Sequence, residues 1–497
     1  MIAIEGFGFR FRDSDRETLH DVTLVVEPGE FLLVTGPSGC GKSVLALAIG
    51  GYLFRQYDVD ARGTVTVAGM DVRQRPVYDI AEAVGLVQQN PEAQFCTLTV
   101  RDEVAFGLEN RCLPRDEIGD RLTWALSIVG AEHLEERSLA TLSGGEKQKV
   151  AIAAMMATKP QVLILDEPTS NLDPTATLEM FQVIEHIRAK AGMTIIVIEH
   201  KLDYLRRFHP RLVSMDDGRI VYDGPMLDTA HHGPAAIPAR APESAADRPA
   251  IPGWPRNDPL IIVEDLHAGY DERAVLDGIS LSVHAGDFVS VMGDNGSGKT
   301  TFLQCLLGLL KPSGGRVLVM GQDTRRVPVS RLARQVGYVF QNPDHQLFAD
   351  SVWEEAVFAL RQLAGRGALD EAQMARVREL LARCDLGDRL DEHPYRLSYG
   401  QKRRLNLVSV LSYDPRVILL DEMLIGQDPA NAAFLLDLLR GCTARGAAVI
   451  LVNHAPELTG RYANRLLFFD SGQIVVDAPT EEGFAQLASL GRTAYVP

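Results

Sequence analysis

The chain has 497 residues, of which 46% are hydrophobic and 23% charged, so it is long enough for two or more ordinary globular domains. Its formal net charge of −16 argues against nucleic acid as the main partner and against a polybasic membrane patch, because both need concentrated positive charge. The six cysteines are scattered without a Cys-x-x-Cys pair, which favours a reducing compartment over a disulfide framework or a zinc site. The N-terminus lacks the residue order of a signal peptide, and no apolar run approaches the roughly 20 residues of a membrane helix.

Short apolar runs alternate with helical stretches along the chain, which predicts an α/β fold with a largely parallel sheet. In the first half, strands are expected at Phe31–Thr35, 162–165 and Thr194–Ile198, and a helix opens at Lys42–Ile49. The pattern turns helical between residues 89 and 142, which predicts a small helical subdomain inserted into the α/β core.

The same motifs occur twice. Gly-Pro-Ser-Gly-Cys-Gly-Lys-Ser at 36–43 recurs as Gly-Asp-Asn-Gly-Ser-Gly-Lys-Thr at 293–300, and Leu-Asp-Glu at 165–167 recurs at 420–422. Three further motifs, which begin at residues 84, 142 and 200, recur in the same order at residues 336, 397 and 454. Five motifs in one order at a nearly constant spacing predict a duplicated domain.

A stretch rich in Ala and Pro separates the two copies. It has neither a helical nor a strand period, so we expect domains at 1–227 and 259–497 joined by an extended linker at 228–258. His231 and His232 lie inside this stretch and are expected to be solvated, because no further metal ligand is suitably spaced.

Each copy carries a P-loop, Gly-x-x-x-x-Gly-Lys-Ser/Thr, directly after an apolar strand. Its glycines let backbone N–H groups wrap phosphates, its lysine reaches the β- and γ-phosphates, and its last hydroxyl binds Mg²⁺. Ser43 and Thr300 are therefore also candidate metal ligands. The expected ATP-binding residues are Gly36, Pro37, Ser38, Gly39, Cys40, Gly41, Lys42 and Ser43 in the first copy, and Gly293, Asp294, Asn295, Gly296, Ser297, Gly298, Lys299 and Thr300 in the second.

An acidic pair ends a buried strand in each copy. Asp166 and Asp421 are expected to orient the Mg²⁺ shell, and Glu167 and Glu422 to polarise the attacking water as the catalytic residues. Solubilising charge is the alternative, but the recurrence of the pair together with a P-loop disfavours it.

A third motif, Leu-Ser-Gly-Gly-Glu-Lys-Gln at 142–148, precedes a helix expected at 150–157. A serine and backbone amides at a helix N-terminus form an anion site. Ser143, Gly144 and Gly145 are therefore expected to bind phosphate, as are Ser398 and Gly400 at the matching positions of the second copy.

Together these motifs resemble those of ATP-binding cassette (ABC) ATPases, and the third motif, at 142–148 and again from residue 397, resembles the family's signature motif. Gln89 and Gln341 match the family's Q-loop, Ser-Asn-Leu-Asp at 170–173 matches its D-loop, and His200 matches its switch histidine, which recurs as His454. The resemblance implies two tandem P-loop NTPase domains, each with a mainly parallel sheet, an antiparallel β portion and a helical subdomain. It also implies that the two domains pair head to tail, so that each ATP lies between one P-loop and the opposite signature. Gln89 and Gln341 are then expected among the metal ligands, and His200 and His454 as further catalytic residues that contact the γ-phosphate region.

Two aromatic residues, Phe11 and Tyr270, match the position that stacks on adenine in the family. A core or surface aromatic is the alternative at both positions.

The stretch after each Q-loop glutamine is similar to that of the ATPases of energy-coupling-factor (ECF) transporters, which import vitamins and cobalt or nickel. The resemblance implies a transmembrane coupling protein and a substrate-binding membrane protein as partners, and a peripheral location on the cytoplasmic face of the cell membrane through those partners alone. An exporter subunit is the nearest alternative. A soluble ABC ATPase of translation or repair would need a charged helical linker, basic arms or coiled-coil insertions, which the sequence lacks.

The same stretches are expected to expose acidic and amide side chains that suit an arginine-bearing helix of the coupling protein. An ordinary solvated face is the alternative. The side chains are Glu92, Gln94 and Glu103 in the first copy, and Asp344, Gln346, Glu354 and Glu355 in the second.

The second copy departs from the family pattern in motifs that, in the family, one domain contributes to the ATP site of the other domain. Tyr399 stands where the first copy has Gly144, and Met-Leu-Ile-Gly-Gln-Asp at 423–428 stands where it has Pro-Thr-Ser-Asn-Leu-Asp at 168–173. We therefore expect unequal ATP sites, with the first P-loop receiving the altered signature. A tolerated variant is the alternative, because Ser398 and Gly400 are retained. The transported substrate is not predicted from this chain.

Overall fold

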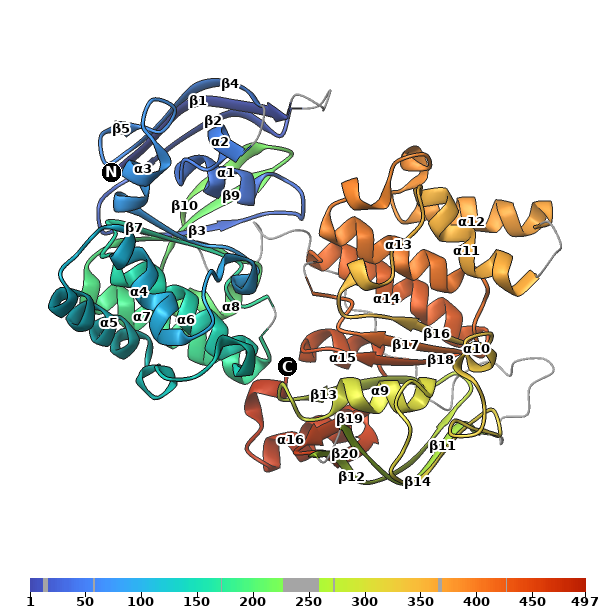
Figure 1. Ribbon diagram of the computed structural model, residues 1–497. Coiled ribbons are helices and arrows are strands. Elements are labelled where there is room, and N and C mark those ends of the chain that lie inside the picture. Colours follow the sequence, from blue (N-terminus) through green and yellow to red (C-terminus); the bar gives the residue numbers. More distant parts are fainter. Residues whose placement is uncertain are drawn as a thin grey trace. The chain divides into compact units, whose positions relative to one another are not determined.

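The computed structural model describes residues 1–11, 17–56, 59–170, 172–226, 259–270, 273–364, 369–425 and 427–497. The chain divides into two compact units, Met1–Ala236 and Ile237–Pro497, which are coloured from blue to green and from green to red in Figure 1. The linker predicted at 228–258, with His231 and His232, lies outside the described residues.

The first unit contains an antiparallel sheet of order β2-β1-β4-β5 and a six-stranded sheet of order β10-β9-β3-β8-β7-β6, which is parallel from β9 to β6. Its strands are β1 (Ile2–Phe11), β2 (Leu19–Val26), β3 (Phe31–Thr35), β4 (Val59–Val67), β5 (Met70–Asp71), β6 (Val84–Val87), β7 (Val162–Asp166), β8 (Thr194–Ile198), β9 (Arg211–Asp216) and β10 (Arg219–Pro225). Its helices are α1 (Lys42–Ile49), α2 (Leu53–Gln56), α3 (Val77–Ala83), α4 (Val100–Asn110), α5 (Arg115–Val129), α6 (Gly144–Ala157), α7 (Pro174–Ala191) and α8 (Leu202–Leu205).

The second unit repeats this topology, with an antiparallel sheet of order β12-β11-β14-β15 and a six-stranded sheet of order β16-β17-β18-β13-β19-β20. Its strands are β11 (Pro259–Tyr270), β12 (Arg273–His284), β13 (Phe288–Gly293), β14 (Gly314–Val319), β15 (Gln322–Asp323), β16 (Val336–Val339), β17 (Val417–Asp421), β18 (Ala448–Val452), β19 (Arg465–Asp470) and β20 (Gln473–Pro479). Its helices are α9 (Lys299–Leu307), α10 (Val329–Leu332), α11 (Val352–Ala364), α12 (Glu371–Arg383), α13 (Tyr399–Leu411), α14 (Pro429–Ala444), α15 (Pro456–Tyr462) and α16 (Thr480–Ser489).

Each six-stranded sheet is buried on both faces, which explains why its central strands are apolar throughout instead of alternating. In the first unit, Leu33 and Leu165 pack with α4 to α7 in one core, while Leu32 and Ile164 pack with α1 and the antiparallel sheet in another. The second unit has the same pair of cores. Since β3, β7 and β8 are parallel, their carboxyl ends meet at one edge, where an α/β sheet binds ligands.

The structure confirms the predicted α/β class, the duplicated domain and the helical subdomain, since residues 89–142 contain the helices α4 and α5. The expected strands at Phe31–Thr35 and Thr194–Ile198 and the helix at Lys42–Ile49 are present. In the part of the chain that the structure describes, no helix is both long and apolar enough to cross a bilayer.

Glu103 and Glu355 are buried, so the expectation that they are exposed is wrong. Each lies in the first turn of its helix, α4 or α11, and turns back towards the loop before it. Glu103 Oε2 accepts the backbone N–H groups of residues 96 and 97 at 3.0 Å, and Glu355 Oε2 accepts those of residues 348 and 349 at 2.9 Å. An acidic residue in a first turn is usually solvated, so the sequence pattern does not reveal this role.

Replacing Glu355 with Ala should destabilise the second unit by about 1–3 kcal/mol, because two buried amides lose their acceptor. Glu355→Gln should retain most of the stability, since one oxygen accepts both bonds and burial raises the pKa of the Glu355 carboxyl. Glu354→Ala, next to it but half-exposed, is the matched control and should cost less than about 0.5 kcal/mol. Denaturant unfolding measures all three variants, and equal losses at the two positions would contradict the capping role.

Candidate nucleotide-binding sites

In both units the P-loop connects a central strand to a helix: β3 to α1 in the first and β13 to α9 in the second. The first residue of each loop has a backbone conformation that requires glycine, with φ of +144° at Gly36 and +143° at Gly293. A Cβ atom on Gly36 would lie 2.1 Å from the carbonyl oxygen of Met215, and one on Gly293 would lie 2.3 Å from that of Phe469. The loop therefore packs directly against the neighbouring strand of the sheet.

The P-loop lysines are buried and directed at their own loops. Each ammonium donates hydrogen bonds to the carbonyl oxygens of the first two loop residues, at 2.8 and 2.9 Å for Lys42 and at 2.9 and 2.8 Å for Lys299. A positive charge is thus fixed inside each loop, as phosphate binding requires.

Cys40 lies inside the first P-loop, and its Sγ is 3.9 Å from Lys42 Nζ. Burial raises the pKa of the Cys40 thiol and outweighs the opposite effect of the lysine charge. The thiol is therefore neutral near pH 7 and packs as a small apolar residue.

A carboxylate ends β7 and β17 beside each P-loop. Burial raises the pKa of Asp166 and of Asp421 to about 6, and the charge of the adjacent glutamate acts in the same direction. Hydrogen bonds from Ser43 to Asp166 and from Thr300 to Asp421 oppose this shift.

These residues suit Mg²⁺. The Oδ1 atom of each aspartate is buried and, within the described residues, accepts no hydrogen bond. A hydroxyl beside such an oxygen offers the hard oxygen ligands that Mg²⁺ prefers, and this ion commonly takes its other ligands from nucleotide phosphates and water. The described residues contain no group of three or more His, Cys, Asp or Glu that could hold a metal by themselves.

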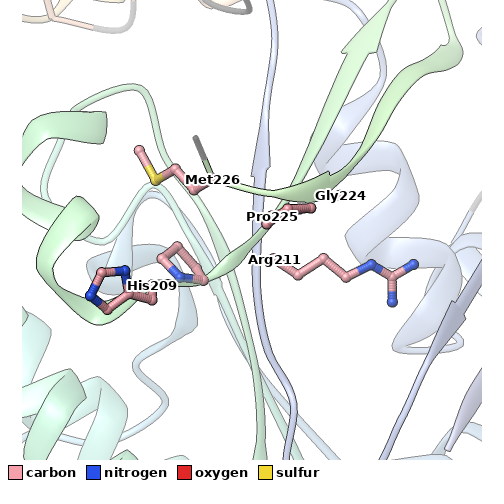
Figure 2. Close-up of a pocket in the computed structure, with 6 residues that line it drawn as sticks. His209, Arg211, Gly224, Pro225 and Met226 are labelled. Carbon is pink, nitrogen blue, oxygen red and sulfur yellow. The ribbon is translucent and has the colours of Figure 1, made fainter. Parts of the chain in front are cut away.

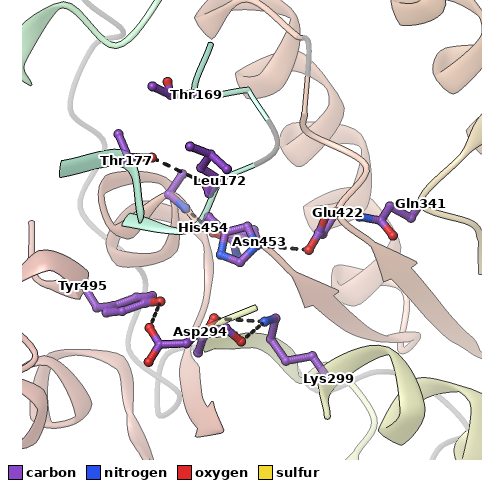
Figure 3. A network of polar contacts seen from close by, with 12 residues as sticks. Thr169, Leu172, Thr177, Asp294, Lys299, Gln341, Glu422, Asn453, His454 and Tyr495 are labelled. Carbon is purple, nitrogen blue, oxygen red and sulfur yellow. Dashed lines mark hydrogen bonds and ion pairs between the residues drawn. The ribbon is translucent and has the colours of Figure 1, made fainter. Parts of the chain in front are cut away.

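In the second unit, Glu422 is held from two sides (Figure 3). Gln341 Nε2 donates to its Oε2 at 2.5 Å, and His454 Nε2 lies 3.0 Å from its Oε1. Burial alone would raise the pKa of Glu422, but His454, Lys299 and Gln341 together lower it below the usual value, so the carboxylate stays ionised. Its φ of 51° is unusual for a non-glycine residue and marks a strained position.

The first unit has the same arrangement. Gln89 Nε2 donates to Glu167 Oε2 at 2.7 Å, His200 Nε2 lies 3.2 Å from Glu167 Oε1, and φ of Glu167 is 47°. Burial opposes ionisation of Glu167, but His200, Lys42 and Lys201 outweigh it and lower the pKa. The structure thus brings together four residues that the sequence predicted from separate motifs.

Sequence reasoning missed Glu199 and Lys201, which flank His200. The buried carboxylate of Glu199 accepts the Thr169 hydroxyl at 2.6 Å and the backbone N–H of His200 at 2.8 Å, while Lys201 Nζ donates to the Thr169 carbonyl at 2.9 Å. This network fixes the histidine relative to the chain that follows Glu167. The only sequence signal was an acidic residue directly before the histidine.

The signature helices begin earlier than the sequence suggested. Helix α6 starts at Gly144, not at residue 150, because Ser143 and Glu146 form a capping box in which each side chain accepts the other's backbone N–H. Ser398 and Gln401 do the same for α13. The Ser-x-x-Glu and Ser-x-x-Gln spacings were the available signal. Ser143, Gly144 and Ser398 are exposed within their own units, and Gly145 and Gly400 are partly so.

Arg403 of α13 was also missed, although it is almost completely buried. It donates to the carbonyl oxygens of Gln341, at 2.9 Å, and Glu422. Its guanidinium lies 4.8 Å from the ring centre of Tyr399, whose hydroxyl accepts a hydrogen bond from it at 3.1 Å. The residue at the matching position in the first unit is Gln148. Tyr399 therefore packs on a cation that the first unit lacks.

The two candidate adenine-stacking residues differ in setting. Phe11 is partly buried and meets Phe9 edge to face, with ring centres 4.8 Å apart. Tyr270 is 47% exposed and donates to Gln304 of α9 at 2.7 Å, so it stands beside the helix that follows the second P-loop. Stacking on adenine stays a prediction for both.

A surface pocket in the first unit lies apart from the P-loop (Figure 2). Its lining residues include Arg211 at the amino end of β9, whereas the P-loop follows the carboxyl end of the parallel strand β3. The Arg211 guanidinium is already paired with Asp223 and Glu30. This pocket therefore does not belong to the nucleotide site.

The family described as ABC transporter matches residues 19–170 and 276–424, once in each unit. A putative ABC transporter ATP-binding protein of Methanosarcina acetivorans is 35% identical over 100% of this chain and 89% of its own length. The putative HMP/thiamine import ATP-binding protein YkoD of Bacillus subtilis is 32% identical over 99% of this chain and 94% of its own length. Among solved structures, cbiO1 from Clostridium perfringens, part of the ABC transporter complex cbiONQ, is 29% identical with a TM-score of 0.41 over 48% of this chain and 98% of that one. The two family matches and the full-length relatives show that the chain belongs to the ABC transporter family, as an ATP-binding subunit with two fused ATPase domains.

Proposed function

We propose that this ATPase energises an importer of the ECF type and works with a transmembrane coupling protein and a substrate-binding membrane protein. The observation that carries the proposal is the full-length similarity to YkoD, whose name assigns that protein to HMP/thiamine import. The ECF-like stretches after Gln89 and Gln341 point the same way. An exporter subunit has no comparable support.

The importer is tested by transport. Co-expression with membrane proteins encoded beside it should give cells that accumulate labelled thiamine or HMP, or a related vitamin, in an ATP-dependent manner. Accumulation should be lost when Lys42 and Lys299 are both replaced by Ala, because neither P-loop then holds phosphate. A complex that instead lowers the cellular content of the label would contradict import.

At each site, the residues of the chain divide the work. The P-loop and its lysine bind the phosphates, while Ser43 with Asp166, or Thr300 with Asp421, would hold Mg²⁺, with Gln89 or Gln341 beside it. When bound, Mg²⁺ neutralises phosphate charge. Glu167 and Glu422 are ionised and can accept a proton from the attacking water, which is their proposed catalytic role.

The histidine and glutamine around each glutamate fix its orientation. In the second unit, Gln341 occupies one carboxylate oxygen and His454 the other, so the group cannot rotate freely. His200 does the same for Glu167. We assign the histidines to the γ-phosphate side of the site, where each links the nucleotide to its glutamate.

The two domains of one chain are proposed to pair head to tail. Ser143, Gly144 and Ser398 are exposed in their own units, so they are accessible to phosphate bound on another domain. Covalent fusion raises the effective concentration of one domain for the other. The second P-loop would then receive Ser143 with Gly144 and Gly145, and the first would receive Ser398 with Tyr399 and Gly400.

The altered signature supports unequal turnover. Tyr399 packs on Arg403, and Gln427 Nε2 donates to the Gly400 carbonyl at 3.2 Å. These contacts tie the second signature to its own unit, whereas the residue that matches Gln427 in the first unit is Leu172, which has no such donor. We therefore propose that hydrolysis runs mainly at the second P-loop, where the signature is unaltered.

Glu422→Gln should abolish nearly all steady-state ATPase activity of the assembled complex, while Glu167→Gln should leave a measurable fraction. Losing preorganised hydrogen-bond donors from the signature at one site would slow ATP hydrolysis at that site by roughly 10²–10³-fold. Tyr399→Gly is the control, because it gives the second signature the glycine that the first has at Gly144. Added to Glu422→Gln, it should raise the residual ATPase activity. If Glu167→Gln proves the more damaging, the proposed asymmetry has the wrong sign.

The face proposed for the coupling protein presents exposed apolar side chains beside the acidic ones that the sequence predicted. Phe348 and Phe358 are 60% and 39% exposed, and their rings meet edge to face at 4.5 Å. In the first unit, Leu98 and Phe106 are exposed in the corresponding segment. Exposed apolar side chains in the same segment of each unit suit a helix of a membrane protein.

The acidic side chains that remain near this face are already engaged. Glu92 pairs with Lys147 of α6, and Asp344 pairs with Lys402 of α13 at 2.8 Å. Each pair joins the segment after the Q-loop to the signature helix of the same unit. A partner bound to this face would therefore lie next to an ion pair that reaches the signature helix.

Replacing Leu98 and Phe348 together with Ser should remove the coupling protein on co-purification and leave the ATPase activity of the isolated chain within about twofold. The loss is expected because burying these side chains supplies the apolar part of the contact. Tyr78→Ser removes a 72% exposed aromatic elsewhere and is the matched control. Co-purification that survives the double replacement would refute this docking face.

A further inference from the structure

The second P-loop contains a carboxylate that the first lacks. Asp294 follows the first glycine of its loop, at the position where the first loop has Pro37. A negative charge this close to bound phosphates would repel them, because Coulomb energies remain large at a few ångströms in a partly buried site. The loop therefore needs a device that neutralises Asp294.

The C-terminal segment supplies two partners for this carboxylate. The Tyr495 hydroxyl donates to Asp294 Oδ1 at 2.7 Å, and Arg492 Nη1 donates to Asp294 Oδ2 at 2.9 Å. Both carboxylate oxygens are thus occupied, as Figure 3 shows for Tyr495. The carbonyl oxygen of the same residue accepts from Lys299 at 2.8 Å, so the side chain and backbone of Asp294 are held by different groups.

The donors are themselves fixed. Tyr495 is fully buried, and its ring meets Phe468 of β19 edge to face at 4.8 Å. It belongs to a separate apolar cluster with Leu487 of α16 and with Met292, which directly precedes the P-loop. Arg492 makes a second ion pair with Asp470 at the end of β19. The segment is therefore anchored to the strand that leads into the loop and to its neighbour.

We propose that Arg492 and Tyr495 form a C-terminal clamp that positions the second P-loop for ATP. The clamp neutralises Asp294 and holds its carboxylate on the side of the loop that faces β19 and the C-terminus. Arg492 and Tyr495 are positioning residues, because they act through Asp294. This inference rests on the proposed role of Lys299 and its loop in binding ATP phosphates.

The clamp would be specific to one of the two sites. Pro37 carries no charge and cannot accept a hydrogen bond through its side chain, so the first loop has no group that needs such a partner. Ion pairs at a surface contribute little to stability, and the Arg492 and Asp294 side chains are 32% and 38% exposed. The expected effect of breaking the pair is therefore on nucleotide affinity and not mainly on folding.

The test uses the full chain with Lys42→Ala, so that nucleotide binds only at the second P-loop. Calorimetric titration with MgATP should show about tenfold weaker binding for Arg492→Glu, because Asp294 is then unpaired and faces a second negative charge. Adding Asp294→Asn to the same chain should restore affinity to within about twofold, since the P-loop then carries no carboxylate that needs a partner. Arg492→Lys should keep most of the affinity, and Arg361→Glu is the charge-matched control.

Tyr495→Phe removes a single hydroxyl and gives a milder second measurement, with binding about two- to threefold weaker. Unchanged affinity in Arg492→Glu, or a loss that Asp294→Asn does not restore, would overturn the clamp. Lys299→Ala, also made in the Lys42→Ala chain, distinguishes a failure of the P-loop assignment from a failure of the clamp. If it leaves MgATP binding intact, the P-loop assignment itself fails and the clamp falls with it; if it abolishes binding while Arg492→Glu has no effect, only the clamp is refuted.

Discussion

Two adjacent carboxylates, largely buried at the end of a central strand in each unit, are the constraint that organises both sites. Like charges side by side and out of water are unfavourable, and each unit compensates with groups from separate elements. Around Asp421 and Glu422 these are Thr300 and Lys299 from the P-loop, with Gln341 and His454 from two further loops. They converge only because β13, β16, β17 and β18 belong to one sheet in which β17 pairs in parallel with β16 and β18, and β18 with β13. The order of the strands is thus what allows the charges to be buried.

The two units solve this problem with the same scaffold and different additions. The second unit has a buried Tyr338 hydroxyl that donates to Asp421 at 3.1 Å, at a position where the first has Leu86. It also has Arg403 under the backbone of Gln341 and Glu422, and the contacts of Arg492 to its P-loop. These additions all fix elements of one proposed catalytic site. They agree with a division of labour in which the second P-loop carries most turnover and the first site binds nucleotide under an altered signature.

Much of the site could be predicted from sequence because its residues follow strands in short, repeated motifs. Asp421, Glu422 and His454 stand at or just after the ends of apolar strands, and Lys299 closes the glycine-rich loop that follows another, so parallel pairing brings them to one edge. Arg403 could not be predicted, because its partners are backbone carbonyls far away in sequence and a basic residue on a helix is normally solvated. Glu355 was placed on the surface because an acidic residue in the first turn of a helix is normally solvated. The pairing of Arg492 with Asp294 joins residues almost 200 positions apart, and no local pattern reports such a contact.

The central claim is that the second P-loop is the main site of hydrolysis. Trapping of photoreactive 8-azido-ADP by vanadate in the assembled complex, followed by mapping of the labelled peptide, locates the site that has turned over. Label concentrated near β11 and α9 of the second unit is the expected result, because that P-loop would receive the unaltered Ser143, Gly144 and Gly145. Label concentrated near β1 and α1 of the first unit, or divided equally between the two, would contradict the claim.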